Sequence, residues 1–185
     1  MKKTSKISNK ALIKKGAKPH KHSAVRMFAQ MEEGSQTSAG SSMAEYSYLG
    51  KNSKLGPNAH LFERAQASAD VQIGSFAVIK EDAHVLIGAR IGRACVISKN
   101  CSIGRNTYVG AETFMAEDSH IGQDCIIGKN CYIGKRAKID HDTILPDNTR
   151  IRRGAHMTKE IMMNLQKSKK EMAQALKAIN PKINV

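Results

Sequence analysis

The stretch ISKNCSIGRNTYVGAETFMAEDSHIGQDCIIGKNCYIGKRAKI, residues 97–139, carries an aliphatic or methionine side chain at every sixth position. The same register runs from Leu49 to Ile151, where 17 of 18 such positions hold a large apolar residue. The residue two positions earlier is small in 17 of the 18 hexads, and side chains two apart on a strand share a face. This short fixed period is typical of a hexapeptide β-helix, whose units bury their apolar side by stacking.

Each hexad also carries the signals of a corner. Glycine directly follows the aliphatic residue in half of the hexads, and Asn or Asp stands at the third position after it in 11 of 18. Asn and Asp tolerate the left-handed backbone that a tight corner requires. Each hexad is therefore predicted to be a short strand followed by a corner.

With these features the chain resembles the hexapeptide-repeat superfamily of left-handed parallel β-helices. That superfamily includes acyltransferases, γ-class carbonic anhydrases and the small pointed-end subunits of dynactin. The resemblance implies that three hexads close one triangular coil. We therefore expect an all-β fold, a single-stranded left-handed parallel β-helix of about six coils, over residues 45–156.

The flanking segments differ in composition from the repeat. Residues 1–44 are predicted to be a basic arm with a Gly/Ser-rich linker, because nine Lys or Arg residues precede the first acid, Glu32. Residues 157–185 are predicted to be a C-terminal amphipathic helix and tail, with Leu165, Met172, Leu176 and Ile179 near helical spacing.

Clustered cations neutralise phosphates or carboxylates without reading a sequence. The basic arm is therefore a candidate for binding nucleic acid, an anionic membrane or an acidic protein, although a solvated tail or a transit peptide is also compatible with it. The candidate polyanion-binding residues are Lys2, Lys3, Lys6, Lys10, Lys14, Lys15, Lys18, Lys21 and Arg26, with Arg150, Arg152 and Arg153 after the repeat.

The composition limits the alternatives. No apolar run approaches the 18 residues that a transmembrane helix needs. The four cysteines are six, 24 and six residues apart, unlike the spacing of zinc-binding pairs, and all fall on the small inward position. We therefore expect buried, reduced thiols, no metal site, no cofactor and a cytoplasmic location, with an organelle matrix as the alternative.

Partner surfaces are expected on the outward residues, which precede each aliphatic. Sorted by coil, these outward residues fall on three faces of the prism. On two faces they are apolar over consecutive coils and form a stripe. Apolar stripes of this length are usually covered by another segment or chain. We expect these faces to contact a C-terminal helix and further copies in a homotrimer or larger assembly. The stripe residues are Val78, Val96, Phe114 and Tyr132 on one face and Tyr108, Ile126 and Ile144 on another.

The third face carries His84 and His120, 36 residues apart. In the acyltransferase branch a histidine acts as general base, so these two are the candidate catalytic residues of an enzyme that would use acyl-CoA as substrate. The γ-carbonic anhydrase pattern is incomplete. If His141 is taken as its first histidine, Pro146 stands five residues later, where its second histidine is expected. The preferred hypothesis is a structural or adaptor module, and the alternative is a hexapeptide-class acyltransferase.

Overall fold

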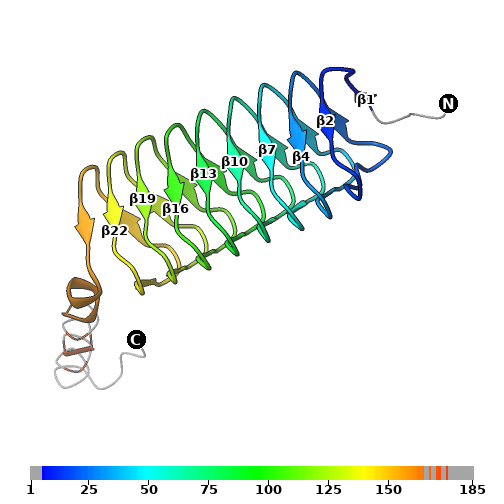
Figure 1. The fold of residues 1–185 in the computed structure, drawn as a ribbon. Helices are drawn as coiled ribbons and strands as arrows, with labels where there is room; N and C mark the ends of the chain where they lie inside the picture. Colours follow the sequence, from blue (N-terminus) through cyan, green and yellow to red (C-terminus); the bar gives the residue numbers. More distant parts are fainter. Residues whose placement is uncertain (1–5, 165–166, 168–169, 172–173, 175–185) are drawn as a thin grey trace.

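The computed structural model describes residues 6–164, 167, 170–171 and 174. They form a parallel β-solenoid of about eight turns, with short strands on three sides and one short helix at the C-terminal end (Figure 1). The predicted left-handed β-helix of the hexapeptide-repeat type is confirmed.

The 25 strands are two residues long and lie in three sheets. Sheet I contains β1 (Lys6–Ile7), β3 (Ala24–Val25), β6 (Ser42–Met43), β9 (His60–Leu61), β12 (Val78–Ile79), β15 (Val96–Ile97), β18 (Phe114–Met115), β21 (Tyr132–Ile133) and β24 (Arg150–Ile151). Sheet II contains β2 (Leu12–Ile13), β4 (Gln30–Met31), β7 (Tyr48–Leu49), β10 (Gln66–Ala67), β13 (His84–Val85), β16 (Ser102–Ile103), β19 (His120–Ile121), β22 (Lys138–Ile139) and β25 (His156–Met157). Sheet III contains β5 (Gln36–Thr37), β8 (Lys54–Leu55), β11 (Gln72–Ile73), β14 (Arg90–Ile91), β17 (Tyr108–Val109), β20 (Ile126–Ile127) and β23 (Ile144–Leu145).

The first described strand begins at Lys6, which corrects both the expected start of the β-helix near residue 45 and the expected six coils. The six-residue register continues backwards through Met43, Met31, Val25 and Ile13, and the small residues before them also face inward. Two positions interrupt the aliphatic series of this register. Pro19 replaces an aliphatic residue, and only an isolated bridge from Lys18 to Gln36 forms there. Thr37 replaces another, and its buried Oγ1 donates to Ser23 Oγ at 2.9 Å.

The interior is aliphatic, and several of its small polar side chains bond to the backbone. All four cysteines are free and buried, and burial raises the pKa of the Cys101 thiol. Its Sγ donates to the carbonyl oxygen of Ala116 at 3.1 Å. Thr107 Oγ1 similarly donates to the Gly122 carbonyl at 2.8 Å. The expected buried thiols are thus confirmed.

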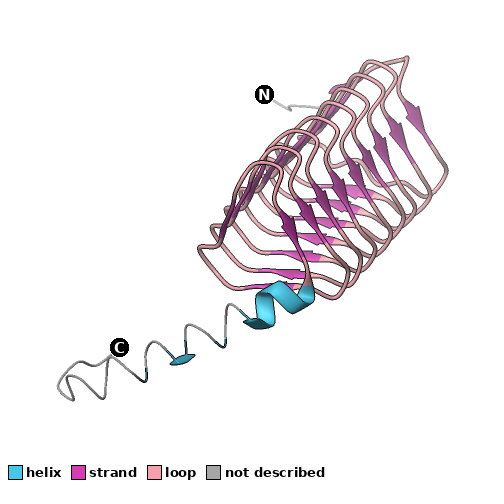
Figure 2. Ribbon diagram, turned by 90° about the vertical axis from the view of Figure 1, so that its left-hand side faces the viewer, coloured by secondary structure: helices cyan, strands magenta, loops and turns pink. Residues whose placement is uncertain are grey.

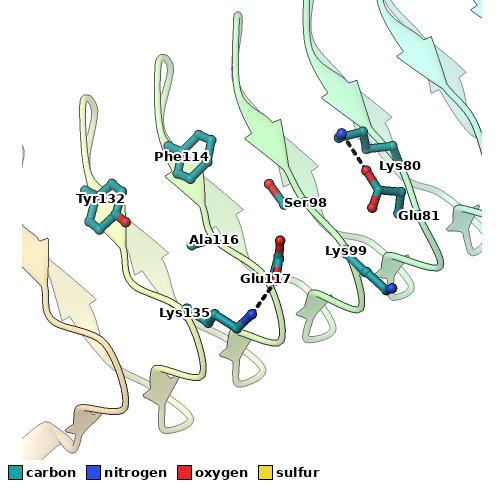
Figure 3. A pocket seen from close by; sticks show the side chains of 9 residues that line it. All are labelled: Lys80, Glu81, Ser98, Lys99, Phe114, Ala116, Glu117, Tyr132 and Lys135. Atoms are coloured by element: carbon teal, nitrogen blue, oxygen red, sulfur yellow. Dashed lines mark hydrogen bonds and ion pairs between the residues drawn. The ribbon is translucent and has the colours of Figure 1, made fainter.

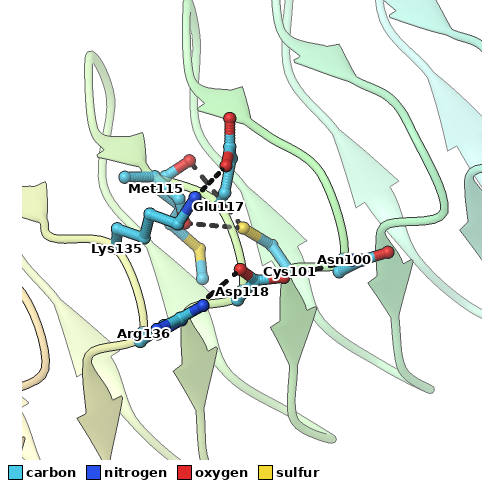
Figure 4. Close-up of polar contacts among 8 residues, drawn as sticks. Asn100, Cys101, Met115, Glu117, Asp118, Lys135 and Arg136 are labelled. Carbon is cyan, nitrogen blue, oxygen red and sulfur yellow. Dashed lines mark hydrogen bonds and ion pairs between the residues drawn. The ribbon is translucent and has the colours of Figure 1, made fainter.

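The corners explain the other repeat positions. Asn100 and Asp118 both have positive φ, and Asn100 Nδ2 donates to Asp118 Oδ1 of the next coil at 3.1 Å (Figure 4). At Gly110, a Cβ atom would lie 2.5 Å from the carbonyl carbon of Gly128 in the next coil. Glycine is required there by close approach of two backbones rather than by an unusual φ.

The helix begins directly after β25 and spans residues 159–164, with 167, 170–171 and 174 also helical. Thr158 caps it, since the Ile161 N–H donates to Thr158 Oγ1 at 3.1 Å. Met162 is buried against the last coil, and the described helix leaves the end of the prism rather than lying along a face (Figure 2). The other apolar residues predicted for it, such as Leu165 and Met172, lie outside the described residues. No helix among the described residues is long and apolar enough to cross a membrane.

Candidate functional site

The apolar stripe of sheet I (Val78, Val96, Phe114 and Tyr132) is a straight column. These outward residues pair in register from β12 to β15, β18 and β21. The Phe114 and Tyr132 rings are stacked with centroids 5.6 Å apart and planes 3° from parallel. Phe114 is 38% exposed and Tyr132 is 42% exposed. The four residues thus share one column, and no described segment covers these two rings.

A hollow of about 380 Å³ lies beside this stripe (Figure 3). Phe114 and Tyr132 form its apolar side, and Ser98 and Ala116 also contribute. The remaining lining residues are charged and come from the strand ends and the corner: Lys80, Glu81, Lys99, Glu117 and Lys135. An apolar wall next to a charged border resembles the centre and rim of a protein interface.

The charged border is internally paired. Lys80 bonds to Glu81 and Lys135 bonds to Glu117 (Figure 3). The hydrogen bond from Lys135 lowers the pKa of the Glu117 carboxyl, and the hydrogen bond to Glu81 raises the pKa of the Lys80 ammonium group. Lys99 makes no ion pair within the described part of the chain. Sequence reasoning missed this border, although Glu81, Lys99, Glu117 and Lys135 recur every 18 residues.

Sheet III carries the second apolar stripe. Tyr108, Ile126 and Ile144 follow one another on β17, β20 and β23. They are 43%, 49% and 56% exposed. This stripe lies in the C-terminal half of the prism, whereas the stripe of sheet I begins at the middle of its sheet, on β12. The described helix leaves the end of the prism and covers neither stripe (Figure 2).

The histidines of sheet II lie in one column, with Ser102 between His84 and His120. His120 Nδ1 lies 2.8 Å from Ser102 Oγ. Partial burial, with smaller contributions from His141 and Lys138, lowers the pKa of His120. This shift favours the neutral imidazole, the form that a general base requires. Neither His120 nor His84 lines the hollow beside Phe114.

The histidines near the incomplete carbonic anhydrase pattern make other polar contacts. His141 Nδ1 accepts a hydrogen bond from the Gln123 N–H at 2.9 Å, and His156 Nε2 contacts Asp140 Oδ1 at 2.6 Å. Within the described ranges, no three His, Cys, Asp or Glu side chains converge on a point that can hold a metal ion.

The predicted polyanion-binding residues divide between the two ends of the prism. Lys6 to Arg26 lie on the first coils, whereas Arg150 lies on β24 and Arg152 and Arg153 follow it. Lys2 and Lys3 lie outside the described residues. Among these cations, Lys14 pairs with Glu32 at 2.9 Å.

Comparison with known proteins identifies the family. The family model described as the GMPPB C-terminal domain matches residues 73–177. This chain belongs to that family. The part shared with the GMPPB C-terminal domain contains both apolar stripes, both candidate histidines and the hollow, and it excludes the basic first coils.

Solved structures show which other proteins share the fold of this chain. The UDP-N-acetylglucosamine O-acyltransferase LpxA of Moraxella catarrhalis RH4 superposes with a TM-score of 0.78 at 18% identity over 82% of this chain. A second UDP-N-acetylglucosamine acyltransferase superposes with a TM-score of 0.53 at 18% identity over 77% of this chain. The chain spans 66% and 68% of the lengths of these two proteins. At this identity the likeness establishes the fold alone. No curated protein sequence matches the chain.

Proposed function

We propose that this chain is a rigid assembly module that associates with further copies of itself, as a homotrimer or within a larger complex, through the stripe of sheet I. The observation that supports this most directly is the column of Val78, Val96, Phe114 and Tyr132, straight over consecutive coils and ending in two exposed, stacked rings. A contiguous apolar column rimmed by charge is typical of an interaction surface.

The energetics favour a covered stripe. Fully burying a large apolar side chain contributes about 1.5–3 kcal/mol. Phe114 and Tyr132 still expose about two-fifths of their surface, and planar aromatic side chains lose little conformational freedom on contact. The strands below them are fixed by parallel pairing on both sides, so the surface is ordered before a partner arrives. Such preorganisation reduces the cost of association.

A second candidate function, acyl transfer, is supported by His120. Its lowered pKa and its contact with Ser102 are suitable for a general base, and the fold occurs in acyltransferases. Under this alternative, His120→Ala would lower turnover with an acyl-CoA about 100-fold or more. Under the preferred proposal, the chain has no acyl-CoA turnover to lose.

Measurement of particle mass tests the proposal. Sedimentation equilibrium of the full chain at micromolar concentration should give an oligomer. Phe114→Lys with Tyr132→Lys should give a monomer with an unchanged β-type circular dichroism spectrum. The matched control is Gln66→Lys with Gln72→Lys, which adds the same charge at exposed outward positions of sheets II and III. A monomeric wild-type chain, or an oligomer that persists in the stripe variant, would refute self-association through this surface.

A further inference from the structure

The N-terminal end of the prism carries a dense positive charge. Residues 6–31 contain seven Lys or Arg residues and no Asp or Glu. Lys14 is neutralised by Glu32 at 2.9 Å. Within the part of the chain that the structure describes, the other six, Lys6, Lys10, Lys15, Lys18, Lys21 and Arg26, make no ion pair.

These cations surround the end of the prism rather than lining one side. Lys6 belongs to β1 in sheet I, and Lys10 lies in the corner that follows it. Lys15 lies in the next corner, after β2, and Lys18 forms the bridge to Gln36 on the third side. Lys21 lies in the third corner. All sides of the first coil therefore carry a positive charge, at the end marked N in Figure 1.

Apolar side chains are exposed at the same end. Ile7 is 41% exposed because β1 has a described neighbour on one side only, and Leu12, the outward residue of β2, is 51% exposed. Met27 and Phe28 are exposed in the corner of the following coil. The Phe28 ring is covered on one side by the Lys10 ammonium group, 5.3 Å from its centroid.

An aromatic pair also lies exposed in these corners. Phe28 and Tyr46 both have φ values of 63°, a backbone conformation that is uncommon for bulky residues, although Phe76 adopts it at the equivalent corner position of a later hexad. The two rings stack with centroids 4.9 Å apart, and Tyr46 remains 60% exposed. The corners next to the basic end therefore carry an exposed aromatic surface.

We propose that the N-terminal end of the prism docks end-on against a membrane surface that contains anionic phospholipids. A ring of cations around the end of a prism can engage a planar anionic surface all at once, whereas a nucleic acid strand or an acidic peptide reaches one side of it. Exposed aliphatic and aromatic groups among the cations enter the headgroup region, as in other interfacial segments. The proposal does not depend on self-association, because one copy carries the whole ring.

Vesicle sedimentation with the full chain tests this docking. Vesicles of phosphatidylcholine with about 30% phosphatidylserine should bind the chain, and vesicles of phosphatidylcholine alone should not. Each cation near an anionic surface contributes a factor of about five to affinity. Lys10→Glu, Lys15→Glu and Lys21→Glu together should therefore weaken binding by roughly 100-fold or more. Raising the salt concentration from about 50 to 150 mM should weaken wild-type binding as charges are screened.

The matched control makes the same change of charge away from both the ring and the hollow beside Phe114, with Lys54→Glu, Lys129→Glu and Lys138→Glu. It should bind the anionic vesicles within a few-fold of the wild type. Ile7→Ser with Leu12→Ser keeps every cation and should weaken vesicle binding while leaving the binding of a 30-nucleotide single strand unchanged. Three results would each overturn the proposal. The first is an equal loss of vesicle binding in the control variant, and the second is no vesicle binding by the wild type. The third is that the oligonucleotide or polyglutamate binds more tightly than the anionic vesicles do.

Discussion

Substitution of Gly110 by alanine tests how closely the coils are stacked. The added Cβ would lie 2.5 Å from the carbonyl carbon of Gly128, 2.6 Å from its oxygen and 2.7 Å from the Lys129 nitrogen. Carbon atoms in optimal contact are about 3.5–4.0 Å apart. All three neighbours are backbone atoms, and the Gly110 N–H is itself bonded to the Ile127 carbonyl at 2.8 Å. The clash can be relieved only by separating two coils.

Overpacking of this kind costs about 1–3 kcal/mol, and we expect the upper end because no flexible side chain can move aside. The reduced freedom of the unfolded chain offsets about 0.4–1 kcal/mol. The net loss is then about 2 kcal/mol, which lowers the urea midpoint by about 1 M at a slope of about 2 kcal/mol/M. Urea unfolding followed by circular dichroism measures it.

The matched control is Ala116→Gly, at the equivalent position after β18, where the structure already accommodates a Cβ. We expect it to change the free energy of unfolding by no more than about 1 kcal/mol. If Gly110→Ala unfolds at the same urea concentration as the wild type, the close stacking described for this face is wrong.

Three further outcomes are expected. Cys101→Ala should lower the free energy of unfolding by only about 1 kcal/mol, with no release of zinc on metal analysis. The pKa of His120 is lowered in the folded state, so the unfolded chain binds more protons at this side chain. The free energy of unfolding should therefore fall as the pH drops below 6.5, the ordinary pKa of histidine. Urea unfolding at several pH values should show that His120→Gln removes this contribution to the pH dependence. Deleting residues 1–44 removes β1–β6 and uncovers the buried Leu49, so the urea midpoint should fall; an unchanged midpoint would show that these coils add nothing to the core.

The interior of this fold was predictable because each inward position obeys one constraint. Each two-residue strand presents one large side chain to the core. The residue two positions before it also faces inward, and it is small. Ile103 and Cys101 satisfy this rule, and both are fully buried. Parallel stacking at a constant offset of 18 residues then fixes which outward residues are neighbours, as Val96 and Phe114 are.

The first coils were missed because two kinds of signal disagreed. Lysine content and Gly/Ser content favoured an extended arm, while Met31 and Met43 continued the register. The register proved correct, since the lysines occupy outward and corner positions where charge costs the core nothing. Pro19 and Thr37 interrupted the aliphatic series without breaking the coil, because a proline can occupy an edge position and a buried hydroxyl can find a partner.

The two proposals combine in one geometric consequence. If a threefold axis parallel to the prism axis relates the copies, the rotation does not invert them, so prisms that lie alongside one another through sheet I have their N-terminal ends on the same side. Three basic ends would then meet one membrane together, and each contact after the first would be intramolecular. Phe114→Lys with Tyr132→Lys, which changes no residue of the basic end, should therefore weaken binding to anionic vesicles by at least tenfold relative to the Gln66→Lys, Gln72→Lys control. Equal vesicle affinity for the two variants, with only the control oligomeric, would show that the copies do not present their basic ends to one surface.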